Sequence, residues 1–179
     1  MLIDKDKTAA VAIDYQERIL PAMDGREELL SCSCRFLEGL KILGVPVFLT
    51  QQYTRGLGMT VNEITRAAGT AEYTDKLEFS AAGALEGLLP AAEVTPFVLV
   101  CGIEAHVCVL QTCIALKEKG YTPLLVTDCA ASRRRSDMEI ALRRAQQEGV
   151  LLTTSEAVLF ELLGAAGTPE FKQISRLVK

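Results

Sequence analysis

Short apolar runs alternate with amphipathic helical segments along almost the whole of this chain. A short uninterrupted apolar run is typical of a strand covered on both faces, and parallel strands require a crossover connection between them. The alternation therefore predicts an α/β fold, a three-layer sandwich of Rossmann type with a mostly parallel central sheet and helices on both faces. The expected strands are Thr8–Ile13, Val45–Thr50, Phe97–Cys101, Pro123–Thr127 and Val150–Thr153.

Helical periodicity and capping signals mark the segments between these runs. Asp24 and Glu27 form a capping box before the first helix, and Gly44 follows its last turn. Residues 51–75 are polar and contain three glycines, so we expect a long excursion of the functional kind, then a short extended piece around Lys76. The other expected helices are Ala81–Leu89, Val107–Lys119, one capped by Ser136 and Glu139 and running to Gln147, one from Ser155 to Leu163, and an amphipathic piece from Thr168 and Pro169.

Length and composition restrict the organisation, the partners and the compartment. A chain of 179 residues predicts a single domain spanning 1–179. The net charge of −4 argues against nucleic acid or an anionic membrane as a partner, because both are bound through clustered positive charge. The first residues lack the apolar segment of a secretory signal, so we expect a cytoplasmic protein whose six cysteines are free thiols.

The single histidine, His106, excludes several kinds of site. Zinc fingers, H-E-x-x-H proteases and three-histidine metal sites all need more imidazoles than this chain has. The six cysteines do not occur in a C-x2-C spacing, and no G-x-S-x-G elbow is present to expose a nucleophilic serine. We therefore expect neither a metal nor a cofactor.

The carboxyl ends of the predicted strands point to candidate chemistry, since ligands of such sheets bind there. Asp14, the segment 102–108 and Asp128 each follow a strand. Cys108 lies in the first turn of the helix after the central strand, where unpaired N–H groups stabilise a thiolate or an oxyanion. The alternative is a small buried hydrophobe, which is the favoured interpretation for Cys101, Cys113 and Cys129.

A nucleophilic thiol needs a base and a neighbouring cation. Asp14 is the best-placed carboxylate, although a capping role is an equal alternative. Lys76 would lower the pKa of the thiol if it lay beside the pair, but a lysine in such a stretch is more often a surface charge. His106 is two residues from Cys108, a spacing that does not bring helical side chains together. The run Arg133–Arg135 reads as a solvated charge run rather than an anion clamp.

Five segments together resemble the isochorismatase-like cysteine hydrolases. GIEAHVCVLQT (102–112) is similar to the nucleophile motif of that superfamily, and the similarity covers nearly the whole chain. The Glu104–His106 variant and the late segment resemble the branch called isochorismatase domain-containing proteins. The other similar segments are AIDYQ (12–16), KLEFSA (76–81), VTDCAASR (126–133) and TTSEAVLFELL (153–163).

The resemblance implies a catalytic triad of Asp14, Lys76 and Cys108. It also implies a cis peptide between Ile103 and Glu104, with the amides of Glu104 and Cys108 forming an oxyanion hole. The implied activity is hydrolysis of a small amide, carbamoyl or related carbonyl substrate through a thioester, by a homo-oligomer that is a dimer or larger. The expected pocket residues are Gln16, Tyr53, Phe79, Glu104 and His106.

Three departures narrow this expectation. The chain lacks the histidines with which nicotinamidases bind a metal, and true isochorismatases, which cleave a vinyl ether, lack the nucleophilic cysteine. Glu104 stands where many members of that superfamily have a small or hydroxyl residue, so its carboxylate either narrows the pocket, selects a cationic group, or points away. The alternatives to an amide hydrolase are a catalytically silent binding or scaffold protein, an isochorismatase-type ether hydrolase, and an oxidation sensor at Cys108.

Overall fold

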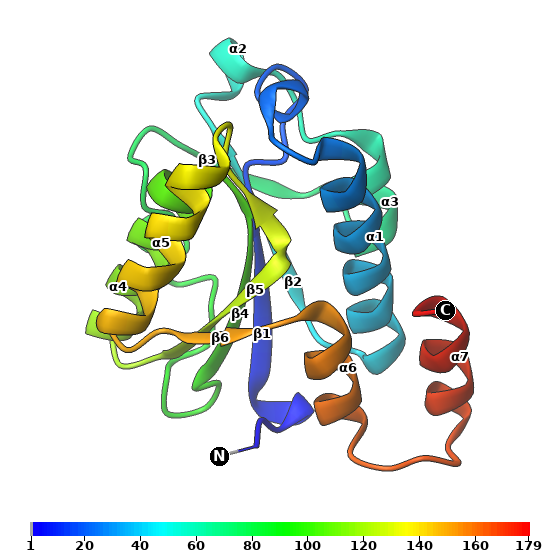
Figure 1. Ribbon diagram of the computed structural model, residues 1–179. Coiled ribbons are helices and arrows are strands. Elements are labelled where there is room, and N and C mark those ends of the chain that lie inside the picture. The colour runs from blue at the N-terminus through cyan, green and yellow to red at the C-terminus, as the bar shows by residue number, and fades with distance from the viewer. Residues whose placement is uncertain (1) are drawn as a thin grey trace.

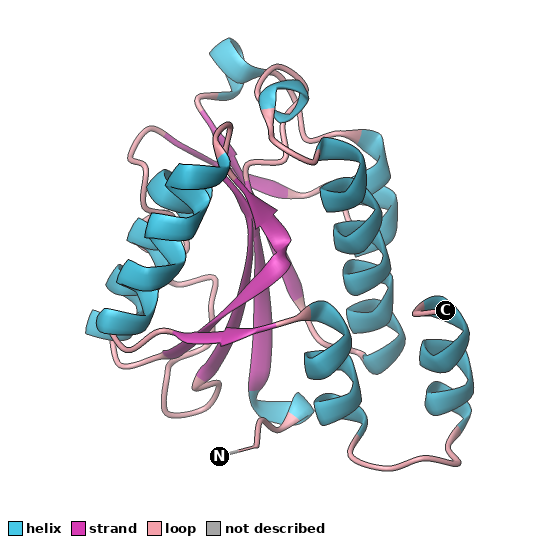
Figure 2. Cartoon of the chain, viewed as in Figure 1, coloured by secondary structure: helices cyan, strands magenta, loops and turns pink. Residues whose placement is uncertain are grey.

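The protein is a three-layer α/β sandwich built on a six-stranded parallel sheet (Figures 1 and 2). The computed structural model describes residues 2–179. The strands lie in the order β3-β2-β1-β4-β5-β6, which is the order of a doubly wound sheet. They are β1 (Thr8–Ile13), β2 (Val47–Gln52), β3 (Tyr73–Lys76), β4 (Phe97–Ile103), β5 (Thr122–Ala131) and β6 (Leu151–Thr153).

Helices cover both faces of this sheet (Figure 1). One outer layer contains α1 (Arg26–Leu43), α3 (Asn62–Ala68), α6 (Ser155–Leu163) and α7 (Pro169–Leu177), and the other contains α4 (Leu110–Glu118) and α5 (Arg135–Gln147). The shorter elements are α2 (Thr54–Leu57), the 3-10 turns Lys5–Lys7 and Leu20–Ala22, and a π-helical turn at Ala105–Val109.

Two hydrophobic cores fill the spaces between the layers, and the strands divide their side chains between them. Along β1, Ala10 and Ala12 belong to the core under α1, whereas Ala9, Val11 and Ile13 belong to the core under α4. Every residue of β1 and β4 is buried, which is why both strands read as continuous apolar runs rather than as alternating patterns.

The strand order has its switch point between β1 and β4. From β1 the chain proceeds through β2 and β3 to one edge, and from β4 it proceeds through β5 and β6 to the other. At a switch point the connections leave their strands in opposite directions and open a crevice beyond the carboxyl ends. Asp14 follows β1 and the turn Ala105–Val109 follows β4, so the topology places both at this crevice.

Several predicted boundaries are wrong. No helix forms over 81–89: its hydrogen bonds are isolated turns, because Gly87 has a φ of 79° and Pro90 follows. The predicted excursion over 51–75 contains α2 and α3, and the helix after β4 begins with a π-helical turn.

The predicted helix caps at Asp24 and Ser136 are also wrong. Gly25 precedes α1 with a φ of 63° and without a side-chain cap, and Arg134 takes the corresponding position before α5. Thr154 caps α6, which runs from Ser155 to Leu163 as predicted, and Thr168 and Pro169 begin α7 as predicted.

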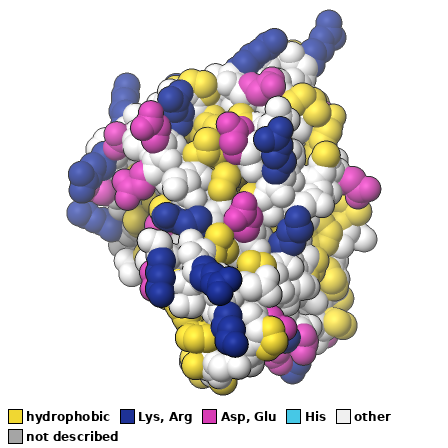
Figure 3. All heavy atoms as spheres, turned by 90° about the vertical axis from the view of Figure 1, so that its right-hand side faces the viewer, with side chains coloured by type: hydrophobic (Ala, Val, Ile, Leu, Met, Phe, Trp, Pro, Cys, Tyr) yellow, Lys and Arg dark blue, Asp and Glu magenta, His cyan; other side chains and the backbone are white. Residues whose placement is uncertain are grey.

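Both signs of charge are distributed over the face formed by α1, α3 and α7 (Figure 3). Lys and Arg side chains alternate there with Asp and Glu side chains and with apolar patches. None of the helices in residues 2–179 combines the length and the apolarity needed to cross a bilayer.

Candidate active site

Asp14 leaves the end of β1 in a left-handed backbone conformation, with a φ of 56°. Such a conformation costs a non-glycine residue about 1–3 kcal/mol and is concentrated at functional sites. The carboxylate is buried and accepts a hydrogen bond from Thr50 Oγ1 at 2.8 Å and one from Lys76 Nζ at 2.7 Å. Its partners are side chains of two neighbouring strands, so the capping alternative for Asp14 is wrong.

Lys76 ends the edge strand β3 and points its ammonium into the interior. The side chains of Lys76 and Asp14 are 0% and 2% exposed, so the ion pair between them is shielded from solvent. Lys76 Nζ also donates to Gln52 Oε1 at 2.7 Å and to the Phe79 carbonyl at 3.1 Å. The ammonium therefore has the acceptors that a buried cation requires, and the surface-charge alternative for Lys76 is wrong.

The turn after β4 brings the helix with the cysteine close to Asp14. Gly102 has a φ of 130°, and a Cβ atom there would lie 2.2 Å from the Ile13 carbonyl oxygen, so only glycine allows β4 to approach β1 this closely. The Ile103–Glu104 peptide bond is cis. The π-helical turn then begins, with Val109 N–H donating to the Glu104 carbonyl at 3.2 Å.

Cys108 lies in this turn, 7% exposed, and both members of the buried ion pair act on its thiol. Burial and the Asp14 carboxylate raise the pKa of Cys108 to about 12, outweighing Lys76, which lowers it. The expectation of an acidified thiol is therefore wrong, because desolvation of the anion is the largest effect. At neutral pH Cys108 holds its proton.

A cavity of about 270 Å³ connects these groups with the surface. Its lining is mostly apolar, with a few polar groups placed together, as is typical of small-molecule sites. Asp14, Cys108, Phe79 and Glu104 therefore meet at one cavity, whereas Lys76 lies behind Asp14. The lining residues are Asp14, Ile19, Gln52, Leu57, Phe79, Ile103, Glu104, Val107, Cys108 and Arg133.

A second ion pair lies at this cavity, between Glu104 and Arg133. The Glu104 side chain is 6% exposed, and its two carboxylate oxygens each accept a hydrogen bond from Arg133 Nε at 3.1 Å. Glu104 Oε2 also accepts one from the backbone N–H of Arg133 at 3.0 Å. Glu104 is therefore a cavity residue. Arg133, which was predicted to belong to a solvated charge run, is 62% exposed but binds this buried carboxylate.

Three expected pocket residues do not line the cavity. Gln16 is fully buried and joins two loops, donating to the carbonyls of Gln52 and Gly58. Tyr53 is half exposed and its ring lies against Gly56. His106 points to Ser132, with its Nδ1 2.9 Å from the hydroxyl oxygen. Each side chain contacts a neighbouring segment instead of the cavity, and spacing along the sequence does not reveal such contacts.

Several residues of this site were not predicted from the sequence. Gln52 and Thr50 lie at the carboxyl end of β2, where the rule that identified Asp14 would have found them. Leu57 comes from α2 and Ile19 from the turn after β1. Neither residue carries a signal of function in the sequence, because apolar lining residues resemble core residues until the fold brings them together.

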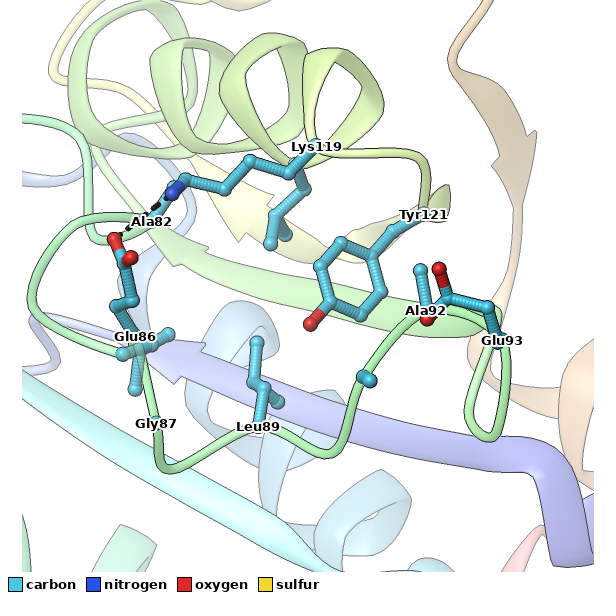
Figure 4. A pocket seen from close by; sticks show the side chains of 11 residues that line it. Ala82, Glu86, Gly87, Leu89, Ala92, Glu93, Lys119 and Tyr121 are labelled. Carbon is cyan, nitrogen blue, oxygen red and sulfur yellow. Dashed lines mark hydrogen bonds and ion pairs between the residues drawn. The ribbon is translucent and has the colours of Figure 1, made fainter.

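Another cavity, of about 260 Å³, lies between residues 82–93 and the end of α4 (Figure 4). Lys119 and Glu86 form an ion pair there at 2.9 Å, and Tyr121 donates to the Pro90 carbonyl. This cavity lies near the amino end of β5, away from the carboxyl ends that bind ligands in such sheets. Within residues 2–179, no group of three or more His, Cys, Asp and Glu side chains is arranged to hold a metal ion.

The sequence has relatives along almost its whole length. Residues 8–157 match the sequence model of the isochorismatase domain. The chain belongs to the isochorismatase family. It is 39% identical over 166 residues to isochorismatase domain-containing protein 2 of Bos taurus, covering 93% of this chain and 80% of that protein. Isochorismatase domain-containing protein 1 of Salmo salar is 35% identical over 179 residues, and this chain covers 61% of its length.

Solved structures of isochorismatase-like proteins share this fold. The MAR1 ribonuclease of Caenorhabditis elegans superimposes with a TM-score of 0.91 at 34% identity, covering 99% of this chain and 92% of that one. The Escherichia coli YcaC product, described as an octameric hydrolase of unknown specificity, superimposes with a TM-score of 0.89 over 99% of this chain and 90% of that one. At 19% identity the likeness to YcaC shows the fold alone.

Proposed function

We propose that this isochorismatase-family chain is a cysteine-dependent hydrolase of a small amide, carbamoyl or related carbonyl compound. The observation that carries the proposal is the cavity in which the Cys108 thiol meets the Asp14 carboxylate, with Lys76 2.7 Å behind that carboxylate. A nucleophile, a base and a cation that positions the base are the parts that nucleophilic acyl transfer requires.

The first half of the proposed reaction forms a thioester. Asp14 takes the Cys108 proton as the sulfur bonds to the substrate carbonyl carbon, so the raised pKa of Cys108 is overcome only when a substrate is present. The N–H groups of Glu104 and Cys108 stabilise the resulting oxyanion. Asp14 then returns the proton to the leaving nitrogen as the C–N bond breaks, and ammonia or an amine departs.

The second half returns the enzyme to its starting state. Asp14 removes a proton from a water molecule whose oxygen attacks the thioester carbon. The C–S bond breaks, the carboxylic acid leaves, and the proton on Asp14 returns to the sulfur. Lys76 holds the carboxylate facing the thiol through both halves, while Thr50 fixes its other oxygen.

Ammonia release from a panel of small primary amides and carbamoyl compounds tests this proposal. We expect turnover that is lost in Cys108→Ala and kept in Cys113→Ala. The Cys113 variant is a matched control, because burial raises the pKa of Cys113 to about 12 as well, yet Cys113 does not line the cavity. A mass increase on Cys108 equal to the acyl group would identify the intermediate.

The same panel, extended with isochorismate and RNA, separates the rival functions. No turnover of any compound supports a silent binding protein, and release of pyruvate from isochorismate supports an ether hydrolase. Cleavage of RNA that persists in Cys108→Ala would support the activity named for the C. elegans neighbour. A reversible sulfenic acid at Cys108 without turnover would support oxidation sensing.

The proposal extends to the compartment and the assembly. All six cysteines are free, which suits the reducing cytoplasm.

Phe79 lines the cavity and is 54% exposed, and Leu77 beside it is 72% exposed, so we propose a homo-oligomer that covers them. Light scattering coupled to size-exclusion chromatography measures the assembly, and a monomer at micromolar concentration would contradict it.

A further inference from the structure

Arg133 is the one cation among the residues that line the cavity. Its partner Glu104 is bound only through Nε and the backbone N–H of Arg133. Across residues 2–179, the two terminal nitrogens of this guanidinium make no hydrogen bond to the protein. The side chain of Arg133 is 62% exposed, so these nitrogens are accessible.

This arrangement prepares Arg133 to bind an anion. A guanidinium presents its donors in a planar fork that matches a carboxylate, and fixing one edge of the fork orients the other. The Nε–H of Arg133 is shared between both oxygens of a carboxylate that is itself buried, and the backbone N–H of Arg133 binds the same group, so the guanidinium is oriented toward Glu104 by its Nε edge. Glu104 also balances the charge of Arg133 when no ligand is present.

We infer that the substrate carries a carboxylate, which Arg133 binds through its terminal nitrogens while the scissile carbonyl lies at Cys108. The inference rests on the proposed hydrolase function and makes Arg133 the residue that determines specificity. Glu104 is a positioning residue, since its side chain acts on the substrate through Arg133.

The rest of the cavity agrees with such a substrate. Besides Arg133 and Cys108, the lining includes the apolar side chains Phe79, Val107 and Leu57. A volume of about 270 Å³ is below the range of roughly 300–1,000 Å³ of drug-sized sites. The structure therefore favours a short aliphatic amide that ends in a carboxylate over a bulky or peptide substrate.

Matched pairs of amides test the inference through a ratio of rates. Succinamate and glutaramate carry a carboxylate, whereas succinamide and glutaramide replace it with a neutral amide of the same size. We expect kcat/KM to be at least about tenfold higher for the better monoacid than for its diamide, the effect of a charge-assisted hydrogen bond. In Arg133→Gln this ratio should fall to near one, and a ratio unchanged from wild type would overturn the inference.

Two further variants separate recognition from general damage. Arg134→Gln removes the same charge from the neighbouring position, which does not line the cavity, so its ratio should match that of wild type. Glu104→Gln should raise the KM for the monoacid about threefold to tenfold relative to the KM for its diamide, because the fork loses its fixed orientation. A loss of kcat alone in Glu104→Gln would contradict the positioning role.

Protection of Cys108 from alkylation tests the anion site without turnover, so it remains decisive if the hydrolase proposal fails. Succinate and glutarate should slow the labelling of Cys108 by iodoacetamide, and 1,4-butanediol at the same concentration should not. The protection should weaken at least about tenfold in Arg133→Gln but not in Arg134→Gln. Equal protection in all three proteins, or none in wild type, would overturn the anion site.

Discussion

Two ion pairs meet at one cavity, and they differ in how water reaches them. Asp14 and Lys76 come from the β1–β3 side of the switch point and are almost completely shielded, with side-chain exposures of 2% and 0%. Glu104 and Arg133 come from the β4–β5 side, where Glu104 is shielded but 62% of Arg133 is exposed. The Asp14–Lys76 pair, which we call the closed pair, is shielded from solvent. The Glu104–Arg133 pair, which we call the open pair, keeps the terminal nitrogens of Arg133 accessible to solvent.

The difference suits the two tasks proposed for the cavity, which are catalysis and recognition of the substrate. A buried pair is costly to desolvate and becomes strongly destabilising when one partner is removed, so its geometry is fixed. A half-exposed pair contributes less stability and can exchange water for a ligand. The proposed proton transfer uses the fixed pair, and the proposed recognition of a carboxylate uses the open one.

Breaking the closed pair should have the largest effect on the stability of the fold. Lys76→Met leaves the Asp14 carboxylate buried without its cation, and we expect the free energy of unfolding to fall by about 3–5 kcal/mol. Urea denaturation followed by circular dichroism measures the loss. Lys119→Met is the control, because its ion pair with Glu86 is exposed and should change stability by less than about 1 kcal/mol. Equal losses in the two variants would contradict the comparison.

The closed pair also sets the reactivity of the cysteine. The pKa of Cys108 is raised to about 12, so at any pH well below that value the fraction of thiolate increases about tenfold with each unit by which the pH rises. Alkylation of Cys108 by iodoacetamide should therefore rise about 100-fold between pH 7 and pH 9 without levelling off. Peptide mass spectrometry at Cys108 measures this rate. A plateau below pH 8 would mean that Lys76 outweighs burial and Asp14.

Loosening the closed pair, rather than breaking it, should have an intermediate effect. Thr50→Val keeps the shape of the side chain but removes the hydroxyl that donates to Asp14 Oδ1 at 2.8 Å. A buried acceptor without its donor costs about 1–3 kcal/mol of stability. Thermal unfolding measures this change, with Thr65→Val on the exposed side of α3 as a control. A Thr50 variant as stable as wild type would show that water replaces the hydroxyl.

Breaking the open pair should have the smallest effect on stability. Arg133→Gln removes the side-chain donor but keeps the backbone N–H that binds Glu104 at 3.0 Å. We expect a loss of about 1 kcal/mol or less, because most of the Arg133 side chain is already in water. Urea denaturation measures this loss, and Arg144→Gln, which breaks the exposed Arg144–Glu148 pair on α5, is the reference for the loss of a surface ion pair. A loss comparable to that of Lys76→Met would assign Arg133 a structural role.

The layers of this fold could be predicted from the sequence because its central strands are covered on both faces. Uninterrupted apolar runs identified β1 and β4, and glycines after helical segments marked where α1 and α4 end. The predicted helix over 81–89 failed because its apolar spacing is helical, whereas Gly87 requires a backbone that a helix excludes. Spacing records which side chains are buried, and it does not record backbone conformation.

The part of the candidate site that depends on strand order could be predicted from the sequence, whereas the side-chain contacts within it could not. The rule of carboxyl ends identified Asp14 and Cys108, which follow neighbouring strands. It did not show that Glu104 binds Arg133, 29 residues away, or that Gln16 turns from the cavity to bind backbone carbonyls. The position of Cys108 in the first turn of a helix predicted a lowered pKa, whereas burial raises the pKa, because the depth of burial follows from packing rather than from position in a helix.

The position of Lys76 at the end of a four-residue outer strand has a further consequence. Successive side chains of a strand point to opposite faces, so a slip of β3 by a single residue against β2 would turn the ammonium away from Asp14. Such a slip would leave both cores intact while disconnecting the base from its cation. Under the proposed mechanism, the alignment of the outermost strand therefore separates an active molecule from one that is folded but inactive.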